Sequence, residues 1–451
     1  MNGKNGKYDV IVVGAGLAGL SCAYELSAKG KKVLILEAHG YAGGRASSFN
    51  DNGMEVESGL HRYIGYYSAL PKLLKNCGVK IGDIVTWEEK ADIIVKNKNK
   101  KLVLGLAPFF APVKTLRGIL GNKDILTVRD KLSLVPFFVS GFISYMFCDK
   151  LDNFSVSEYA CRKGVSEKSK RLILEPLSSG IFFLPPENYS AYAFFGLFAP
   201  AIPKFYKMRI GAFLGGMTDV MCSPIVRKIE ELGGKISYNT PVKSVISKND
   251  RVMGVKAENG NIYSADQIVI ASTLSSAKKI LAPLKSRECL KNFFSLKSMS
   301  ACTIQFELQR PALEKDITAF GPSTDAVSFA EQSRSTFRGK KGRLSVILGN
   351  AGEYCKKSPQ DILKTVVHQL GELGINISDS IVSYRKIAEE DEFYSLDKGN
   401  QYLRPKQKTG IKGLTLAGDY TLTSSFATME GAVLSGKKAA KEVLINIGNL
   451  R

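Results

Sequence analysis

A run of four hydrophobic residues at positions 10–13 is followed at once by glycines and then by apolar residues with helical spacing. Strands buried on both faces read as unbroken apolar runs, so residues 10–13 predict a buried strand and the segment after the glycines predicts a helix. A second apolar run at residues 33–36 predicts the next strand. The pattern therefore predicts a strand–helix–strand unit followed by a glycine loop over residues 8–45.

The rest of the chain alternates between helical and strand patterns. Residues 91–106 alternate as a hairpin, residues 108–206 are mostly apolar and helical, and Ser155 with Glu158 has the spacing of a helix capping box. Further strands are predicted at residues 235–238, 242–247, 252–257, 261–263, 267–271, 302–309, 343–348 and 414–417, and further helices at 218–232, 359–373 and 428–447.

One stretch, residues 132–148, is strongly apolar and carries no charged residue. It lies at the lower length limit for a membrane-spanning helix, and Pro136 and Gly141 interrupt it. Three interpretations stay open. The stretch is a buried core helix, a surface that dips into a membrane or forms the mouth of a tunnel for an apolar ligand, or a transmembrane span.

Composition narrows the class of protein. A length of 451 residues suggests about two or three domains. The formal net charge of +21 favours anionic partners, but the lysines are spread over turns, so we expect peripheral contact with an anionic membrane rather than nucleic-acid binding. Eight cysteines without a paired spacing and three histidines predict neither a metal site nor a disulfide framework. Together with a first strand that starts near residue 8, they predict a cytoplasmic location.

The glycine loop has the spacing of a dinucleotide site. Gly14 allows a tight turn, Gly16 lets the backbone approach a pyrophosphate, and Gly19 lets helix and strand pack closely. The helix that follows directs its N-terminal N–H groups at the phosphates. Glu37 ends the second strand, where an acid binds a ribose hydroxyl and disfavours NADP. The predicted cofactor contacts in this unit are Gly14, Ala15, Gly16, Leu17, Ala18, Gly19, Glu37 and Ala38.

A second nucleotide-site signal stands at the other end of the chain. A strand at residues 414–417 leads to Gly418, Asp419 and a long helix. If both ends serve one ligand, the chain must leave the nucleotide domain and return to it. We therefore predict a discontinuous cofactor domain, residues 1–90, 210–275 and 405–451, interleaved with a substrate domain, residues 91–209 and 276–404.

These motifs together resemble a known superfamily. Gly14 to Gly19, Glu37 and Gly43-Gly44-Arg45 resemble the FAD motif of the flavin amine oxidase and phytoene desaturase superfamily. Residues 416–436 are similar to the tail of plant-type phytoene and ζ-carotene desaturases and of hydroxysqualene dehydroxylases. Weaker resemblances cover residues 57–67, 185–191 and 217–242, and residues 276–404 match nothing. The resemblance implies an α/β plus α+β, amine-oxidase-like fold with a Rossmann-type FAD-binding domain.

The resemblance also implies roles for single residues. Gly43 and Gly44 pass close to the cofactor, and Arg45 binds a phosphate oxygen. Val242 contacts the adenine through its backbone, and Asp419 binds the ribityl or pyrophosphate region. Backbone N–H groups at Met429, Gly431 and Ala432 face the N1 and O2 edge of the flavin, where a helix N-terminus stabilises the charge of the reduced ring.

The flavin carries the difficult chemistry in such enzymes, so few catalytic side chains are expected. The candidates are His61, Tyr63 and Tyr420. Residues 418–431 contain neither Cys nor His, which predicts non-covalent FAD in that loop. We expect an FAD-dependent oxidoreductase that transfers a hydride from an apolar substrate, such as a carotenoid or squalene derivative, to flavin N5. The alternatives are a flavin amine or porphyrinogen oxidase, a non-redox flavin-dependent isomerase or cyclase, and a flavin-binding protein without turnover.

Overall fold

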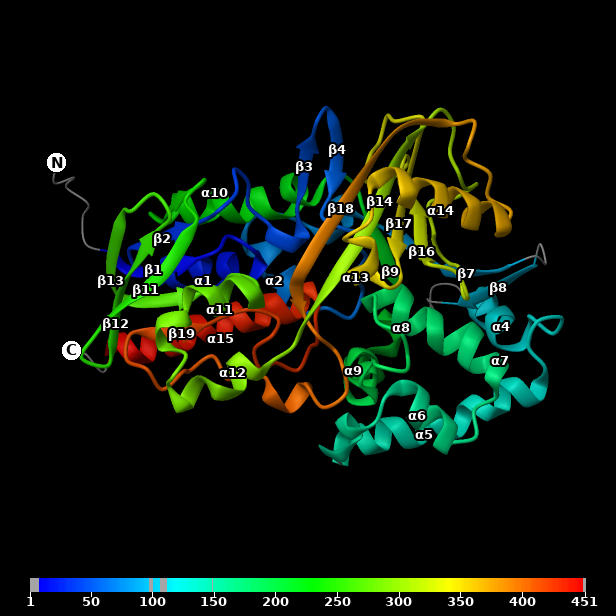
Figure 1. Ribbon diagram of the computed structural model, residues 1–451, viewed down its shortest axis with the longest axis horizontal. Helices are drawn as coiled ribbons and strands as arrows, with labels where there is room; N and C mark the ends of the chain where they lie inside the picture. Colours follow the sequence, from blue (N-terminus) through cyan, green and yellow to red (C-terminus); the bar gives the residue numbers. More distant parts are fainter. Residues whose placement is uncertain (1–7, 97–99, 106–111, 148, 449–451) are drawn as a thin grey trace.

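The computed structural model describes residues 8–96, 100–105, 112–147 and 149–448 (Figure 1). The predicted hairpin tip at 97–99 and the start of the predicted helical region at 108–111 lie outside these residues. Two seven-stranded sheets lie side by side along the long axis, and a block of helices lies below the second one in this view (Figure 1).

The first sheet has the strand order β10-β2-β1-β13-β12-β11, with β19 also paired to β13. Strands β10, β2, β1, β13 and β19 run parallel, and β12 and β11 continue the sheet antiparallel. The bounds are β1 Tyr8–Val13, β2 Val33–Leu36, β10 Lys235–Ser237, β11 Val242–Lys248, β12 Arg251–Ala257, β13 Ile262–Ile270 and β19 Leu414–Leu416.

The sequence prediction of two strands at 261–263 and 267–271 is wrong, because β13 is continuous. Its first half pairs with β12, and from Ala265 onward it pairs with β1. The polar residues between the two apolar segments lie where the strand changes partners, so the ladder continues although the hydrophobic pattern is broken.

Helices α1 (Leu17–Ser27), α10 (Ser223–Glu231) and α15 (Met429–Gly448) bury apolar side chains in one core with the side chains of Val10, Val12 and Ile35. A π-helical turn, η5 (Thr218–Cys222), precedes α10, and the two together cover the predicted helix at 218–232. Where α1 and α15 cross, a Cβ on Gly436 would lie 2.1 Å from the carbonyl oxygen of Ala18. This glycine lets the two helix backbones touch.

The second sheet has the order β18-β14-β17-β16-β15-β7-β8. The predicted hairpin at 91–106 is present as β7 and β8, paired antiparallel. Strands β14 and β18 pair along their length and reach from this sheet toward the first half of the molecule (Figure 1). The bounds are β7 Lys90–Val95, β8 Lys100–Gly105, β14 Ser298–Leu308, β15 Thr318–Phe320, β16 Ala326–Glu331, β17 Gly342–Leu348 and β18 Ile381–Tyr394.

The helical block contains a capping box at Ser155 and Glu158, as predicted, with hydrogen bonds of 2.9 and 3.1 Å. Helix α5 (Val128–Phe147) buries Phe137 against Phe194 and Phe195 of α9. The other helices of the block are α4 Pro112–Leu120, η2 Asp149–Asn153, α6 Val156–Arg162, α7 Glu167–Ser169, η3 Lys170–Leu174, α8 Glu175–Phe182, α9 Ala191–Phe198 and η4 Ala199–Lys207.

Two small sheets complete the strands: β3-β4, and β5-β9-β6. Their bounds are β3 Ser48–Asp51, β4 Met54–Glu57, β5 Tyr63–Ile64, β6 Val85–Glu88 and β9 Ile210–Phe213. The remaining helices are η1 Gly44–Ala46, α2 Ala69–Asn76, α3 Ile81–Ile84, α11 Leu274–Ile280, η6 Ala282–Leu284, η7 Glu288–Leu290, α12 Lys291–Ser295, α13 Ala351–Tyr354, α14 Pro359–Glu372 and η8 Gln401–Leu403. We propose that the chain divides into the cofactor domain and the substrate domain predicted from the sequence.

Candidate active site

The β1–α1 turn has the geometry that its glycines predict. Gly14 has a φ of +103°, and a Cβ on Gly19 would lie 1.9 Å from the carbonyl oxygen of Gly14. A Cβ on Gly16, by contrast, would meet nothing closer than 3.9 Å. Gly19 is therefore required by packing, whereas Gly16 borders open space in which a ligand can approach the backbone. The backbones of Ala15, Leu17 and Ala18 continue this turn into α1.

Glu37 is held at the end of β2 by backbone donors. The N–H of Ala15 donates to one carboxylate oxygen at 2.6 Å, and the N–H of His39 donates to the other at 2.9 Å. The N–H of Thr240 donates to the carbonyl oxygen of Glu37 at 2.7 Å. This bond brings the segment before Val242, at the start of β11, beside Glu37 and Ala38.

The two ends of the chain meet at an ion pair. Arg45 Nη2 lies 2.6 Å from Asp419 Oδ1, although the two residues are 374 positions apart. Gly43 reaches the first glycine loop by donating its N–H to Ala15 O at 2.9 Å. Burial alone would lower the pKa of Arg45, but the Asp419 carboxylate together with the charges of Glu389 and Glu392 outweighs that effect and the pKa is raised. Arg45 thus stays charged while it joins both predicted nucleotide motifs.

The N-terminus of α15 is partly satisfied from within the helix. Thr428 Oγ1 accepts from the N–H of Gly431 at 3.1 Å, and Thr428 O accepts from the N–H of Ala432 at 3.0 Å. Two of the donors that the sequence assigned to the flavin edge are therefore already bonded. Met429 is the predicted residue of this group that also lines the cavity described below.

Glu430 has a role that the sequence analysis missed. Its carboxylate accepts from the backbone N–H groups of Ser68, Ala69 and Leu70 at 2.8, 2.7 and 2.9 Å. These are donors at the start of α2, so Glu430 caps that helix and fixes it to α15. The partners are more than 350 positions apart, and no local sequence signal could connect them.

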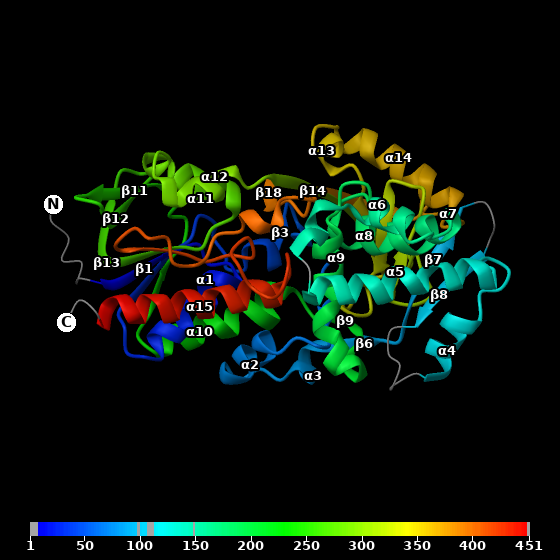
Figure 2. The ribbon, with the colours of Figure 1, turned by 90° about the horizontal axis from the view of Figure 1, so that it is seen from below.

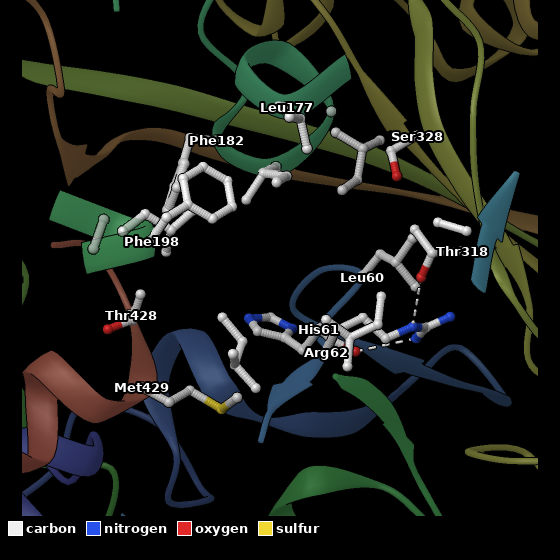
Figure 3. Close-up of a pocket in the computed structure, with 18 of the residues that line it drawn as sticks. Leu60, His61, Arg62, Leu177, Phe182, Phe198, Thr318, Ser328, Thr428 and Met429 are labelled. Carbon is white, nitrogen blue, oxygen red and sulfur yellow. Dashed lines mark hydrogen bonds between the residues drawn. The ribbon is translucent and has the colours of Figure 1, made fainter. Parts of the chain in front are cut away.

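A cavity of about 590 Å³ lies between this region and the second sheet. Its walls are mostly aliphatic and aromatic and come from the loop at 58–62, α5, α8, η4 and the second sheet. Figure 3 shows the ring of His61 between Met429 on one side and Arg62 with Thr318 on the other. The cavity therefore extends from the start of α15 past His61 to the second sheet.

Of the three candidate catalytic residues, His61 lines this cavity. Its Nδ1 lies 3.1 Å from Gly59 O. Burial lowers the pKa of His61 to about 4, and the charges of Arg45 and Arg62 act in the same direction. Its imidazole is therefore neutral at physiological pH.

Tyr63 and Tyr420 are both buried and are not among the described residues that line the cavity. The Tyr63 ring packs against Tyr67, Trp87 and Phe213, and Tyr420 packs against Phe293. Burial raises the pKa of both phenols. The geometry favours His61 over either tyrosine as a group that contacts substrate.

Two cationic side chains in the cavity wall were not singled out from the sequence. Arg62 Nε lies 2.6 Å from Glu88 Oε1 and donates to Thr318 Oγ1 at 3.0 Å. Arg209 lies over the Trp87 ring, with 3.7 Å between Cζ and the ring centroid. Among the described residues that line the cavity, none is Asp or Glu. No local sequence pattern marks these two arginines. They reach the cavity because they lie beside β5, β9 and β6, and those strands come together only in the fold.

The turn with open space at Gly16 and the charged Arg45 beside Asp419 fit a dinucleotide cofactor that spans both motifs. Comparison with known proteins identifies the family. Residues 17–444 match the sequence profile of a family described as "flavin containing amine oxidoreductase". The chain is 27% identical to a 15-cis-phytoene desaturase of an Oncidium hybrid cultivar over 456 residues, 97% of this chain and 78% of that one. It is 26% identical to the 15-cis-phytoene desaturase of Synechococcus elongatus, over 96% and 95% of the two chains.

Among solved structures, putrescine oxidase bound to putrescine superposes with a TM-score of 0.75 at 17% identity, over 97% of this chain and 99% of that one. This likeness confirms the predicted two-domain, amine-oxidase-type fold. The family match confirms the predicted cofactor class and enzyme class. The chain therefore belongs to the flavin containing amine oxidoreductase family and is an FAD-dependent oxidoreductase.

Proposed function

We propose that this enzyme removes hydrogen from the carbon chain of an apolar isoprenoid. The observation that carries the proposal is the cavity of about 590 Å³, whose walls are mostly aliphatic and aromatic and which reaches the start of α15. Apolar ligands bind in such cavities through burial of apolar area. The proteins with similar sequences named above are phytoene desaturases, which supports an isoprenoid substrate.

The charges of the cavity support this substrate over an amine. An ammonium group in an apolar cavity needs a counter-charge or a cluster of acceptors. The described wall carries Arg62 and Arg209 and no carboxylate, so it offers no counter-charge to a cationic substrate. Arg62 is paired with Glu88, whose carboxylate is not among the described residues that line the cavity. A porphyrinogen with its anionic side chains stays the second candidate, since the described wall presents no carboxylate that would repel those side chains.

In this proposal the chain's residues orient the substrate and receive a proton. FAD, when bound, supplies the oxidant for the C–H bond. Rings and aliphatic side chains exclude water and hold the carbon chain along the cavity. With Nδ1 donating to Gly59 O, the acceptor of neutral His61 is Nε2. We infer that Nε2 accepts the proton lost from the carbon next to the oxidised one, so that one hydride and one proton leave and a double bond forms.

Anaerobic mixing of the FAD-loaded enzyme with a panel of isoprenoids, amines and porphyrinogens tests the proposal. The expected result is bleaching of the oxidised flavin band by isoprenoids and formation of a conjugated product in equal amount. Bleaching by amines or porphyrinogens alone would refute it. Conversion of an isoprenoid without bleaching and without consumption of an acceptor would assign a non-redox isomerase or cyclase instead. FAD binding without reduction by any member would assign a binding protein.

We further propose that the helical block rests on an anionic membrane surface. Exposed apolar side chains on one face of α5, at 4- and 3-residue spacing, are Val128, Leu132, Val135, Val139, Ile143 and Met146. Beside this face Phe138 and Phe142 line the cavity. Ile202 and Phe205 of η4 are exposed and also line the cavity, so this apolar surface surrounds a cavity mouth. Figure 2 shows α5 across the face turned to the viewer.

Basic side chains flank the apolar surface, which favours anionic lipid headgroups. They are Arg117, Lys123, Arg129, Lys150 and Lys207, all exposed. No helix in the described part of the chain combines the length and apolarity needed to cross a membrane. The proposal is therefore docking in the interface plane, with apolar side chains inserted and the basic groups at the headgroups.

Co-sedimentation with vesicles tests this docking. We expect binding to vesicles with anionic lipid that falls with salt, and weaker binding to phosphatidylcholine alone. The double variant Val139→Glu with Ile143→Glu should lose binding and keep the folded flavin spectrum. Ile262→Glu, which changes an exposed apolar side chain on the first sheet, is the matched control and should bind as the wild type does. Equal binding by both variants, or none by the wild type, would refute the docking surface.

A further inference from the structure

Arg404, which follows η8, is a buried cation that bonds almost entirely to one loop. Its Nη2 donates to the carbonyl oxygens of Asp419, Thr421 and Ser425 at 3.0, 2.5 and 3.3 Å. It also reaches Thr423 Oγ1 at 3.3 Å. All these acceptors lie on residues 419–425, which connect β19 to α15. A single guanidinium thus holds together the loop that links Asp419 to the start of α15.

The charge of Arg404 has no carboxylate partner among the described residues. The nearest candidate, Asp419, offers only its backbone carbonyl, because its carboxylate pairs with Arg45. The rings of Tyr394 and Phe426 lie 5.4 and 4.8 Å from the guanidinium carbon. Arg404 Nε is buried without a hydrogen-bond partner. Carbonyl dipoles and aromatic faces offset part of the cost of burying a charge, but a counter-ion is missing.

We propose that Arg404 is a positioning residue whose uncompensated charge acts on the flavin. FAD carries a diphosphate, and its reduced ring carries further negative charge. A fixed cation in a region of low dielectric constant favours both, and it favours the reduced ring more than the oxidised one. The inference rests on the proposed location of FAD between Asp419 and the start of α15. It predicts that Arg404 raises the reduction potential of the bound flavin.

The alternative is that Arg404 only holds the loop at 419–425 in place and has no electrostatic effect on the flavin. The reduction potential distinguishes the two roles. We would measure the two-electron midpoint potential of the bound flavin by dye equilibration in the holoenzyme, together with the FAD dissociation constant and the melting temperature. Arg404→Gln should make reduction at least tenfold less favourable, a fall of about 30 mV or more. Arg404→Lys keeps the charge but not the planar fork, so it should lose melting temperature and keep most of the potential.

Arg343→Gln is the matched control, since Arg343 is equally buried but lies on β17 of the second sheet. It should lower the melting temperature and leave the potential unchanged. An unshifted potential in Arg404→Gln would overturn the inference. If that variant cannot be isolated with FAD, Arg404→Lys decides. If the flavin potential of Arg404→Lys falls by about 30 mV, which is tenfold in the reduction equilibrium, then the geometry of Arg404 and not its charge sets the potential. A wild-type chain whose FAD lies elsewhere would instead refute the proposed site.

Discussion

Glu57, at the end of β4, is predicted to make the stability of the protein depend on pH. The side chain is 1% exposed, and one of its oxygens accepts from Gln332 Nε2 at 3.1 Å while the other has no partner. Burial raises the pKa of Glu57 from 4.5 to about 8, and the Gln332 hydrogen bond and the charge of Arg62 only partly oppose this. At neutral pH the folded protein therefore holds a proton on Glu57 that the unfolded chain has lost.

The direction of the pH dependence of stability follows from this difference in proton binding. Between about pH 4.5 and pH 8 the folded state binds more protons than the unfolded state, so the free energy of unfolding falls as pH rises. Each unit of pKa difference corresponds to about 1.4 kcal/mol, so the full loss contributed by Glu57 is on the order of 5 kcal/mol above pH 8. Glu57→Gln is neutral throughout and lacks this contribution.

Urea unfolding of the holoenzyme in excess FAD, from pH 5 to pH 9, measures the effect. We expect the wild type to lose stability relative to Glu57→Gln by several kcal/mol across this range, with most of the loss below pH 8. Glu353→Gln, which changes an exposed carboxylate, is the control and should follow the wild type. Parallel pH curves for the wild type and Glu57→Gln would refute the reasoning, because they would mean that Glu57 is ionised in the folded protein.

Three further predictions concern packing and chemistry. Gly436→Ala should separate α1 from α15, lower stability by about 1–3 kcal/mol and weaken FAD binding in a titration, whereas Gly371→Ala on α14, where a Cβ meets open space, should not destabilise. His61→Asn should retain FAD and slow anaerobic flavin reduction by about 10²–10⁴-fold, and the wild-type rate should fall with acid only near pH 4. A wild-type loss of rate near pH 6.5 would contradict a neutral, buried His61. Phe137→Ala should cost about 3–5 kcal/mol in denaturant unfolding, whereas Phe147→Ala, at an exposed position, should cost little.

The cofactor half of the fold was predictable because its signals are local. An apolar strand, a glycine turn and a helix follow one another within residues 8–27, and each has its own periodicity. The second sheet was harder to predict, because its pairings are distant. Strand β18 pairs with β14 about 80 positions earlier, and β15 pairs with β7 more than 200 positions earlier. Strand β18 is also rich in charged residues, so neither alternation nor an apolar run marks it.

Helix α5 shows a different limit. Its sequence is apolar around most of its circumference, which favours a buried helix but is also consistent with a helix that contacts a membrane or lines a tunnel mouth. In the structure one face packs on α9, as a core helix does, and the other face is exposed; contact of that exposed face with a membrane stays a proposal. The sequence could not divide the two faces because the division depends on which neighbour covers the helix. A membrane would be expected to cover the face that no helix covers.

The residues of the site also differ in how far they could be predicted from their neighbours in the sequence. Glu37 and Asp419 could be assigned because the chemistry of each depends on a glycine or strand beside it in the sequence. Arg62 and Arg404 could not be, because their partners, Glu88 and the carbonyls of residues 419–425, are brought to them only by the fold. The family's motifs thus predict the cofactor site, while the cationic residues that we propose to act on the flavin and on the choice of substrate lie outside the motifs. For this reason the potential of Arg404→Gln and the ligand preference of the cavity carry more information about this particular enzyme than further changes in its glycine loop would.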